Sequence, residues 1–339
     1  MNDDRRLTAG LAAVSQACDV ARRVQRDLER VKGITKDDKS PVTVADFAVQ
    51  AVVAMMLYES LGSRTLIVGE EHTQALRTAD QKPVLDAVVE AVRRARPDAS
   101  AGDVLRGIDL CDHDAAADAY WTLDPIDGTK GFLRGQQYAI ALAHIERGEV
   151  ALGVMGCPNL PADHDASLES ADAHGCIYTA RRGGGAWEQI GTQVEGSCRR
   201  IHAAAEAGIA GIRACESVEA AHSKHDDVER VVELAGGKDA ARSARLDSQC
   251  KYAVVARGQA DAYLRMPTKK GYVEKIWDHA AGMLIAQEAG AIVTDIAGAP
   301  LDFARGRTLE RNRGIVCASA GVHRRLTDAI AELRIGAAV

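Results

Sequence analysis

Hydrophobic residues recur every three or four positions near the start of the chain, which is the spacing of one face of a long α-helix. They are Leu7, Leu11, Val14, Cys18, Ala21, Val24, Leu28 and Val31. This amphipathic period follows the charged opening residues directly, so we do not expect a signal peptide. A polar loop that Pro41 stiffens should separate this helix from a second, more apolar helix that opens at Thr43–Asp46 and stops at Gly62. Asp46 would then lie in a first helical turn.

Short β-rich segments come next, and two of them lead into acidic residues. Residues 65–68 are followed directly by Gly69-Glu70-Glu71, and residues 120–123 are followed directly by Asp124. Two hairpins are predicted after them, one pairing 138–145 with 150–155 and the other pairing 176–179 with 187–190. The pattern up to about residue 205 therefore indicates an α+β arrangement.

Strands and helices alternate in the remainder of the chain. We predict strands at 212–215, 243–246, 262–264, 291–294 and 313–317, and helices at 226–234, 250–256, 279–289 and 322–333. This alternation is typical of a second α/β layer. We therefore expect an α+β domain over 1–205 and an α/β domain over 206–339.

Composition narrows the class of protein. The 339 residues are 47% hydrophobic, which excludes disorder, and the net charge of −6 gives no basic field for a nucleic-acid polymer. The eight cysteines show no zinc-type pairs, so we expect them to be reduced and mostly buried. The most apolar run, 47–58, is shorter than the roughly 20 residues of a membrane span. We expect a soluble, cytoplasmic protein without a membrane partner, and we favour a monomer.

The stretch Asp124-Pro125-Ile126-Asp127-Gly128-Thr129 carries the clearest chemistry. Two carboxylates so close together cannot both be buried without a cation, because each unpaired buried charge costs several kcal/mol. Oxygen ligands suit a hard ion such as Mg²⁺, and Gly128 with Thr129 could hold a phosphate oxygen. An ordinary turn remains an alternative, since Asp, Pro and Gly are common turn residues.

Three other acidic positions have ordinary explanations when each is taken alone. Glu70 could belong to a solvated loop, Asp46 to a capping arrangement with Thr43, and Asp278 to the N-cap of a helix. Their occurrence together with Asp124 and Asp127 favours one shared acidic site.

The combination of motifs resembles a known family. Gly69-Glu70-Glu71, the hexapeptide at 124–129 and Trp277-Asp278-His279-Ala-Ala-Gly282 are similar, in order and spacing, to the lithium-sensitive, Mg²⁺-dependent phosphatases related to inositol monophosphatase. The longer phrases at 40–46, 124–138 and 275–282 resemble the 3'(2'),5'-bisphosphate nucleotidases, in their longer eukaryote-type branch. The resemblance covers most of the chain and implies a layered α-β-α-β-α sandwich.

That resemblance also implies roles for individual residues. Glu70, Asp124, the Ile126 carbonyl, Asp127 and Asp278 would bind two or three Mg²⁺ ions. Asp46 with Thr129 would orient the attacking water, and the N–H groups of Gly128 and Thr129 would hold the phosphate. These roles agree with two-metal hydrolysis of a phosphate ester, which needs no covalent intermediate.

A nucleotide with two phosphates needs contacts beyond the acidic cluster. By resemblance, His222 would lie against adenine, while Ser248, Lys251 and Arg265 would lie near the base and the second phosphate. Arginine suits a bidentate phosphate contact. Without the resemblance, His222 would be interpreted as a surface histidine, and Lys251 and Arg265 as solvated cations.

The expected activity is hydrolysis of the 3'-phosphate of 3'-phosphoadenosine 5'-phosphate to AMP and phosphate, as a clearance step in sulfur metabolism. The sulfated precursor is a second expected substrate. The alternatives are an inositol monophosphatase, an inositol 1,4-bisphosphate 1-phosphatase, or a silent nucleotide sensor. A sensor is disfavoured because every expected metal and water-orienting residue is present.

Overall fold

The computed structural model describes residues 3–31, 40–205, 211–218, 225–236, 244–267, 269 and 271–336. Its helices are α1 (Asp3–Val31), α2 (Ser40–Leu61), α3 (Lys82–Arg93), α4 (Ala101–Asp109), α5 (Thr129–Arg134), α6 (His225–Leu234), α7 (Cys250–Ala256), α8 (Ala280–Glu288) and α9 (Ala320–Glu332). Its strands are β1 (Ile67–Gly69), β2 (Ala119–Asp127), β3 (Ala139–Glu146), β4 (Glu149–Cys157), β5 (Cys176–Arg181), β6 (Gly185–Ile190), β7 (Cys198–Ile201), β8 (Ala214–Glu216), β9 (Ala244–Arg245), β10 (Ala262–Arg265), β11 (Ala291–Thr294) and β12 (Ile315–Ser319).

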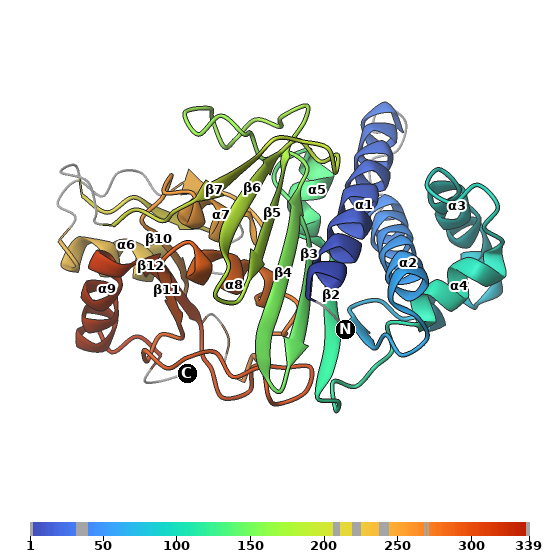
Figure 1. Cartoon of the computed structure of the whole chain (residues 1–339). Helices are drawn as coiled ribbons and strands as arrows, with labels where there is room; N and C mark the ends of the chain where they lie inside the picture. Colours follow the sequence, from blue (N-terminus) through green and yellow to red (C-terminus); the bar gives the residue numbers. More distant parts are fainter. Residues whose placement is uncertain are drawn as a thin grey trace.

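These elements stack in five layers (Figure 1). Helices α1 and α2 cover one face of a seven-stranded sheet in the order β1-β2-β3-β4-β5-β6-β7, and α8 with α7 covers the other face. Beyond α7 lies a five-stranded sheet in the order β11-β12-β10-β8-β9, with α6 and α9 outside it. The predicted α-β-α-β-α sandwich is confirmed.

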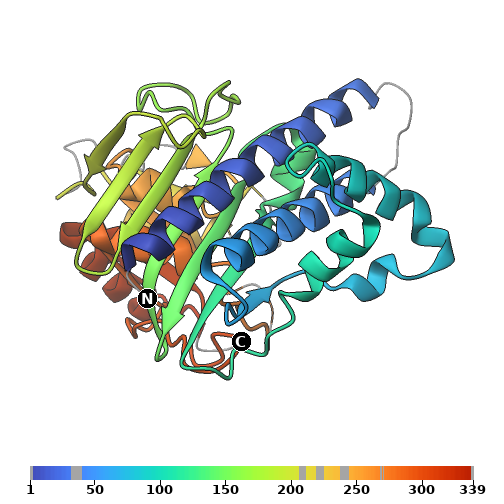
Figure 2. The same cartoon turned by 45° about the vertical axis from the view of Figure 1, so that its right-hand side comes forward.

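The two long N-terminal helices differ in their patterns because they occupy different environments. Helix α1 is amphipathic and lies across the sheet beside α2 (Figure 2). Helix α2 is apolar all round because it is enclosed by α1, the sheet, α3 and α4. Its stretch Val44–Leu61 is long and apolar enough to cross a membrane, but 67% of it is buried in the fold, as in a core helix. The fold is of the soluble type, whereas the cytoplasmic location stays a prediction.

The start of α2 differs from our expectation. The helix begins at Ser40, so Pro41 lies in its first turn, where a missing N–H costs nothing. Asp46 is therefore in the second turn and not the first, and the alternative of a cap formed with Thr43 is wrong because both residues lie inside the helix.

The elements that were not predicted are short or peripheral. Helices α3 and α4 lie outside α2, and α4 starts with a capping box in which Ser100 and Asp103 bond each other's backbone N–H groups. Strand β7 is the edge strand of the large sheet and is mostly exposed, so it lacks an alternating pattern. Both hairpins and the strand-helix alternation after residue 205 are confirmed, with shifts of one or two residues at the ends.

One continuous apolar cluster joins the two sheets. Tyr178 of the large sheet, Tyr252 of α7, Ala281 of α8 and Cys317 of the small sheet all belong to it. All eight cysteines are free, and all except Cys198 are buried, as expected. The division into domains at about residue 205 stays a prediction.

Candidate active site

A cavity of about 380 Å³ lies where the ends of β1 and β2 meet the starts of α5 and α7. It is lined by Glu70, Asp124, Ile126, Asp127, Gly128, Thr129, Lys130, Ser217, Asp247, Ser248, Gln249, Lys251, Tyr263, Arg265, Tyr272 and Asp278. The structure thus brings together the predicted residues from both halves of the chain. Asp46 lies beside this lining, next to Glu70 and Glu71, and His222 is outside the described residues.

A bulge in β2 places both aspartates of the hexapeptide in this cavity. Residues three apart in a regular strand point to opposite faces. Here the register against β3 shifts, because Asp124 pairs with Ala141 while Asp127 pairs with Ala139. The extra residue turns both carboxylates to the same side of the strand. The alternative of an ordinary turn would not require both carboxylates to face one cavity.

Gly128 and helix α5 come directly after Asp127 in the chain. Gly128 is in the left-handed region at φ +86, and an added Cβ would lie 2.8 Å from the Ser248 Cβ. Helix α5 then begins at Thr129, and the first N–H groups of a helix have no partner within it. The Thr129 hydroxyl donates to the Ile126 carbonyl at 3.3 Å.

The turn carrying Glu70 is held from two sides. Gln50 of α2 donates from Nε2 to the Glu71 carbonyl at 2.8 Å, and its Oε1 accepts from the Glu71 N–H at 3.0 Å. On the other side, Arg307 donates from Nη2 to the Gly69 carbonyl at 2.6 Å. Gly69 allows this close packing, since a Cβ would lie 2.7 Å from Gln50 Oε1. The backbone on both sides of Glu70 is therefore fixed, while Glu70 itself is exposed and lines the cavity.

Gln249 connects Asp127 with the segment carrying Asp278. Its N–H donates to Asp127 Oδ2 at 2.6 Å, its Nε2 donates to the Trp277 carbonyl at 2.8 Å, and its Oε1 accepts from the Gly282 N–H at 3.0 Å. The N-cap of α8 is His279, so the alternative of Asp278 as the cap is wrong.

The carboxylates destabilise one another's charge. The pKa of Glu70 is raised to about 8 by burial, then by the charges of Asp278 and Glu71. That of Asp278 is raised to about 6, chiefly by burial. Asp124 is 3% exposed, its pKa is raised well above the usual range by burial and by Glu70, and its Oδ1 has no hydrogen-bond partner among the described residues. An all-oxygen set with an unpartnered buried oxygen fits a hard divalent cation.

A second acidic group adjoins the first. Ligand atoms of Glu274, Asp278 and His279 all lie within 4.8 Å of one another. Glu274 already accepts from Arg265 Nε at 2.9 Å, and His279 Nδ1 is bonded to the Tyr252 hydroxyl at 3.0 Å. Within this group, Asp278 is the member that also lines the cavity with the other carboxylates.

The same cavity also contains positively charged side chains. Lys251 is 3% exposed, so its interpretation as a solvated cation is wrong, and its Nζ donates to the Leu246 carbonyl at 3.1 Å. Burial lowers its pKa, while the charge of Asp127 raises it. Arg265 points to the same cavity from the end of β10, and Ser248 adopts φ +69 beside them.

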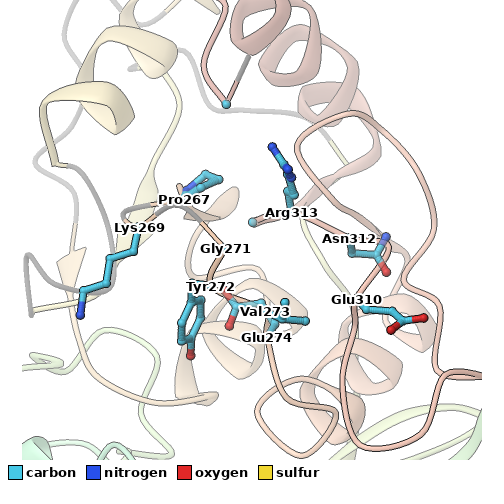
Figure 3. A pocket seen from close by; sticks show the side chains of 11 residues that line it. Pro267, Lys269, Gly271, Tyr272, Val273, Glu274, Glu310, Asn312 and Arg313 are labelled. Carbon is cyan, nitrogen blue, oxygen red and sulfur yellow. The ribbon is translucent and has the colours of Figure 1, made fainter. Parts of the chain in front are cut away.

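A smaller hollow of about 100 Å³ is shown in Figure 3 and shares a lining residue with this cavity. Tyr272 borders both spaces, and its hydroxyl accepts from Arg265 Nη2 at 3.4 Å. The sequence did not point to Tyr272, Gln50, Gln249 or Arg307. Their residue types are common, and only tertiary contacts bring them to the site.

Comparison with known proteins agrees with this geometry. The family model described as "Inositol monophosphatase family" matches residues 7–335.

The chain belongs to the inositol monophosphatase family.

Among the relatives, a 3'(2'),5'-bisphosphate nucleotidase of Emericella nidulans is 40% identical over 325 residues, covering 89% of this chain and 91% of that protein. The 3'(2'),5'-bisphosphate nucleotidase of Schizosaccharomyces pombe is 38% identical, covering 98% and 96%. Members of this family are metal-dependent phosphatases that generally use Mg²⁺, and the chain is a phosphatase.

Solved structures of the family share the fold. An inositol monophosphatase from Anabaena (Nostoc) aligns with a TM-score of 0.60 at 18% identity and covers 100% of both chains. CysQ from Bacteroides thetaiotaomicron aligns with a TM-score of 0.59 at 20% identity, covering 93% of this chain and 97% of that one.

Proposed function

We propose that this chain removes the 3'-phosphate of 3'-phosphoadenosine 5'-phosphate, giving AMP and inorganic phosphate. The relatives with 38–40% identity are named for this activity. One observation carries most weight: the same cavity is lined by carboxylates and by two cations, Lys251 and Arg265. A substrate with two phosphates could place one phosphate at the carboxylates and the other at the two cations.

The oxygen ligands that would hold Mg²⁺ are Glu70, Asp124, the Ile126 carbonyl, Asp127 and Asp278. When bound, Mg²⁺ supplies positive charge that stabilises the negative charge developing on the phosphate and the leaving oxygen. Occupancy by two or three ions stays a prediction.

The protein's own side chains and N–H groups would accept the proton and orient the phosphate. Asp46 is 7% exposed, and its pKa is raised well above the usual range by burial and by the charges of Glu71 and Glu70. A carboxylate with a raised pKa is suited to accept a proton from the attacking water near neutral pH, and the Thr129 hydroxyl would help to orient that water. The N–H groups of Gly128 and Thr129 would then orient the phosphate that leaves.

The cations Lys251 and Arg265 would hold the 5'-phosphate, with Ser248 near the base. The sulfated precursor would use the same contacts. An inositol monophosphate has neither a base nor a second phosphate, so it would leave these groups without a partner, and their desolvation would not be repaid. Contact of His222 with adenine is proposed by resemblance alone.

Phosphate release with Mg²⁺, from the adenosine bisphosphate and from inositol 1-phosphate, tests the function. We expect a higher kcat/KM on the nucleotide and AMP, not adenosine 3'-phosphate, as the product. Asp124→Asn should abolish turnover on both substrates, whereas the matched change of an exposed aspartate, Asp80→Asn, should have no effect. A higher efficiency on the inositol compound, or tight nucleotide binding without turnover, would contradict the proposal.

A further inference from the structure

The backbone of Arg307 pairs with the segment that precedes Asp278. Its carbonyl accepts from the Ile276 N–H at 3.2 Å, and Lys275 forms an antiparallel bridge with Thr308. Both pairings run beside the residues just before Asp278. The position of the Arg307 backbone is thus tied to the C-terminal half of the site.

The side chain of Arg307 reaches the other half. Its guanidinium stacks on Trp277, with Cζ at 4.9 Å from the ring centroid. From there Nη2 donates to the Gly69 carbonyl at 2.6 Å and Nη1 donates to the His113 carbonyl at 2.9 Å. Gly69 immediately precedes Glu70, and Trp277 immediately precedes Asp278. One side chain therefore contacts the neighbours of two carboxylates that are far apart in the sequence.

We infer that Arg307 is a positioning residue that holds Glu70 and Asp278 at the separation a divalent cation requires. This inference rests on the proposed metal role of those two carboxylates. Arg307 itself touches neither the expected ion nor the substrate.

The physical need for such a contact follows from charge. Glu70 and Asp278 repel each other when no cation lies between them, and they sit on separate segments that could move apart. Gln50 fixes the Glu71 side of the turn but does not connect it with Asp278. The planar guanidinium can bond two carbonyls and stack on an indole ring at once, which a lysine ammonium cannot do.

Two variants and a matched control test this role. Arg307→Met keeps a flexible side chain over Trp277 but removes both donors, and Arg307→Lys keeps the charge but not the planar fork. Arg305→Met is the control, because Arg305 is exposed and its pairing is with Asp302 at 3.4 Å. The Mg²⁺ dissociation constant is measured by calorimetry, and the rise in Tm on adding Mg²⁺ is measured separately from activity.

We expect Arg307→Met to weaken Mg²⁺ binding roughly 10- to 100-fold, as is usual when a residue that orients metal ligands is lost. Arg307→Lys should give a smaller loss, and Arg305→Met none. A purely structural role would lower the Tm of the chelated protein without changing the Mg²⁺ dissociation constant, which would overturn the inference. If Arg307→Met does not fold, unchanged Mg²⁺ affinity in Arg307→Lys overturns it equally. Failure of the unaltered protein to bind Mg²⁺ would instead overturn the proposed metal site.

Discussion

Lys251 is a buried cation that lines the cavity. Burial lowers its pKa while the charge of Asp127 raises it, and the Leu246 carbonyl accepts from Nζ. Among the described residues that carbonyl is the one hydrogen-bond partner of Nζ, so Nζ has donors left for an anionic ligand. Its location suits a role in recognising the part of the substrate that a monophosphate lacks.

Lys251→Met should lower kcat/KM on the adenosine bisphosphate about 10- to 150-fold, from the loss of one charge-assisted hydrogen bond of about 1.5 to 3 kcal/mol. Activity on an inositol monophosphate should fall much less. The control is Lys82→Met, since Lys82 is exposed and pairs with Asp86 on the surface. An equal fall on both substrates would mean that Lys251 acts through Asp127 in the acidic cluster.

Among single residues, the sequence predicted those whose charge and local motif point directly to metal binding. Asp124 and Asp127 stand in one short motif, and Glu70 follows an apolar strand. Gln249 and Arg307 were not predicted, because nothing in their local sequence indicates which carbonyl groups they will reach. Such contacts exist only after distant segments have packed.

Helix α5 shows how closely the elements of the site are packed. Gly131 lies in its first turn, and an added Cβ would be 2.2 Å from the Gln137 carbonyl oxygen and 3.1 Å from the Asp247 Cβ. Arg134, at the end of the same helix, pairs with Asp247. The loop that carries Ser248 and Gln249 is therefore packed directly on α5.

Gly131→Ala should force α5 away from the segment that follows it, because the Gln137 carbonyl oxygen is a backbone atom and cannot move aside as a flexible side chain can. We expect a loss of about 1 to 3 kcal/mol in the free energy of unfolding and a marked loss of activity. Gly102→Ala is the control: Gly102 is a half-buried helical position in α4, and the nearest atom to an added Cβ is in the flexible Arg106 side chain at 3.2 Å. Denaturant unfolding of both variants checks this, and unchanged stability of Gly131→Ala would contradict the packing argument.

Element prediction succeeded where hydrophobic periodicity was strong, as in α1, the two hairpins and the second α/β layer. It missed α3 and α4, which pack mainly on α2 and are only 12 and 9 residues long, too short for a strong periodic pattern. The bulge in β2 was also not predicted, because register depends on the partner strand β3.

The acidic cluster should make the stability of the whole metal-free molecule depend on pH. In the folded protein the pKa of Glu70 is raised from 4.5 to about 8, and that of Asp278 from 3.8 to about 6. The unfolded chain releases these protons near the lower values, so the folded state binds more protons in between. Stability is therefore greatest at the acidic side of this window and is lost as pH rises through it.

We expect the Tm of the chelated protein to fall as pH is raised from about 5 to about 8. Mg²⁺ should reduce this slope, because a cation replaces the protons in neutralising the carboxylates. Asp124→Asn should flatten it as well, since one of the repelling charges is gone. Melting curves across this range with and without Mg²⁺ provide the measurement, and parallel curves would show that the cluster does not control stability.

The origin of the site from segments far apart in the chain also bears on the kinetics of folding. Glu70 enters from β1 and Asp278 from the start of α8, with roughly two hundred residues between them, so both carboxylates meet only after the two sheets have packed around α7 and α8. An ion bound there stabilises an interaction that forms late, and such interactions act mainly on the barrier to unfolding. Mg²⁺ should thus extend the lifetime of the folded molecule while leaving its rate of formation almost unchanged.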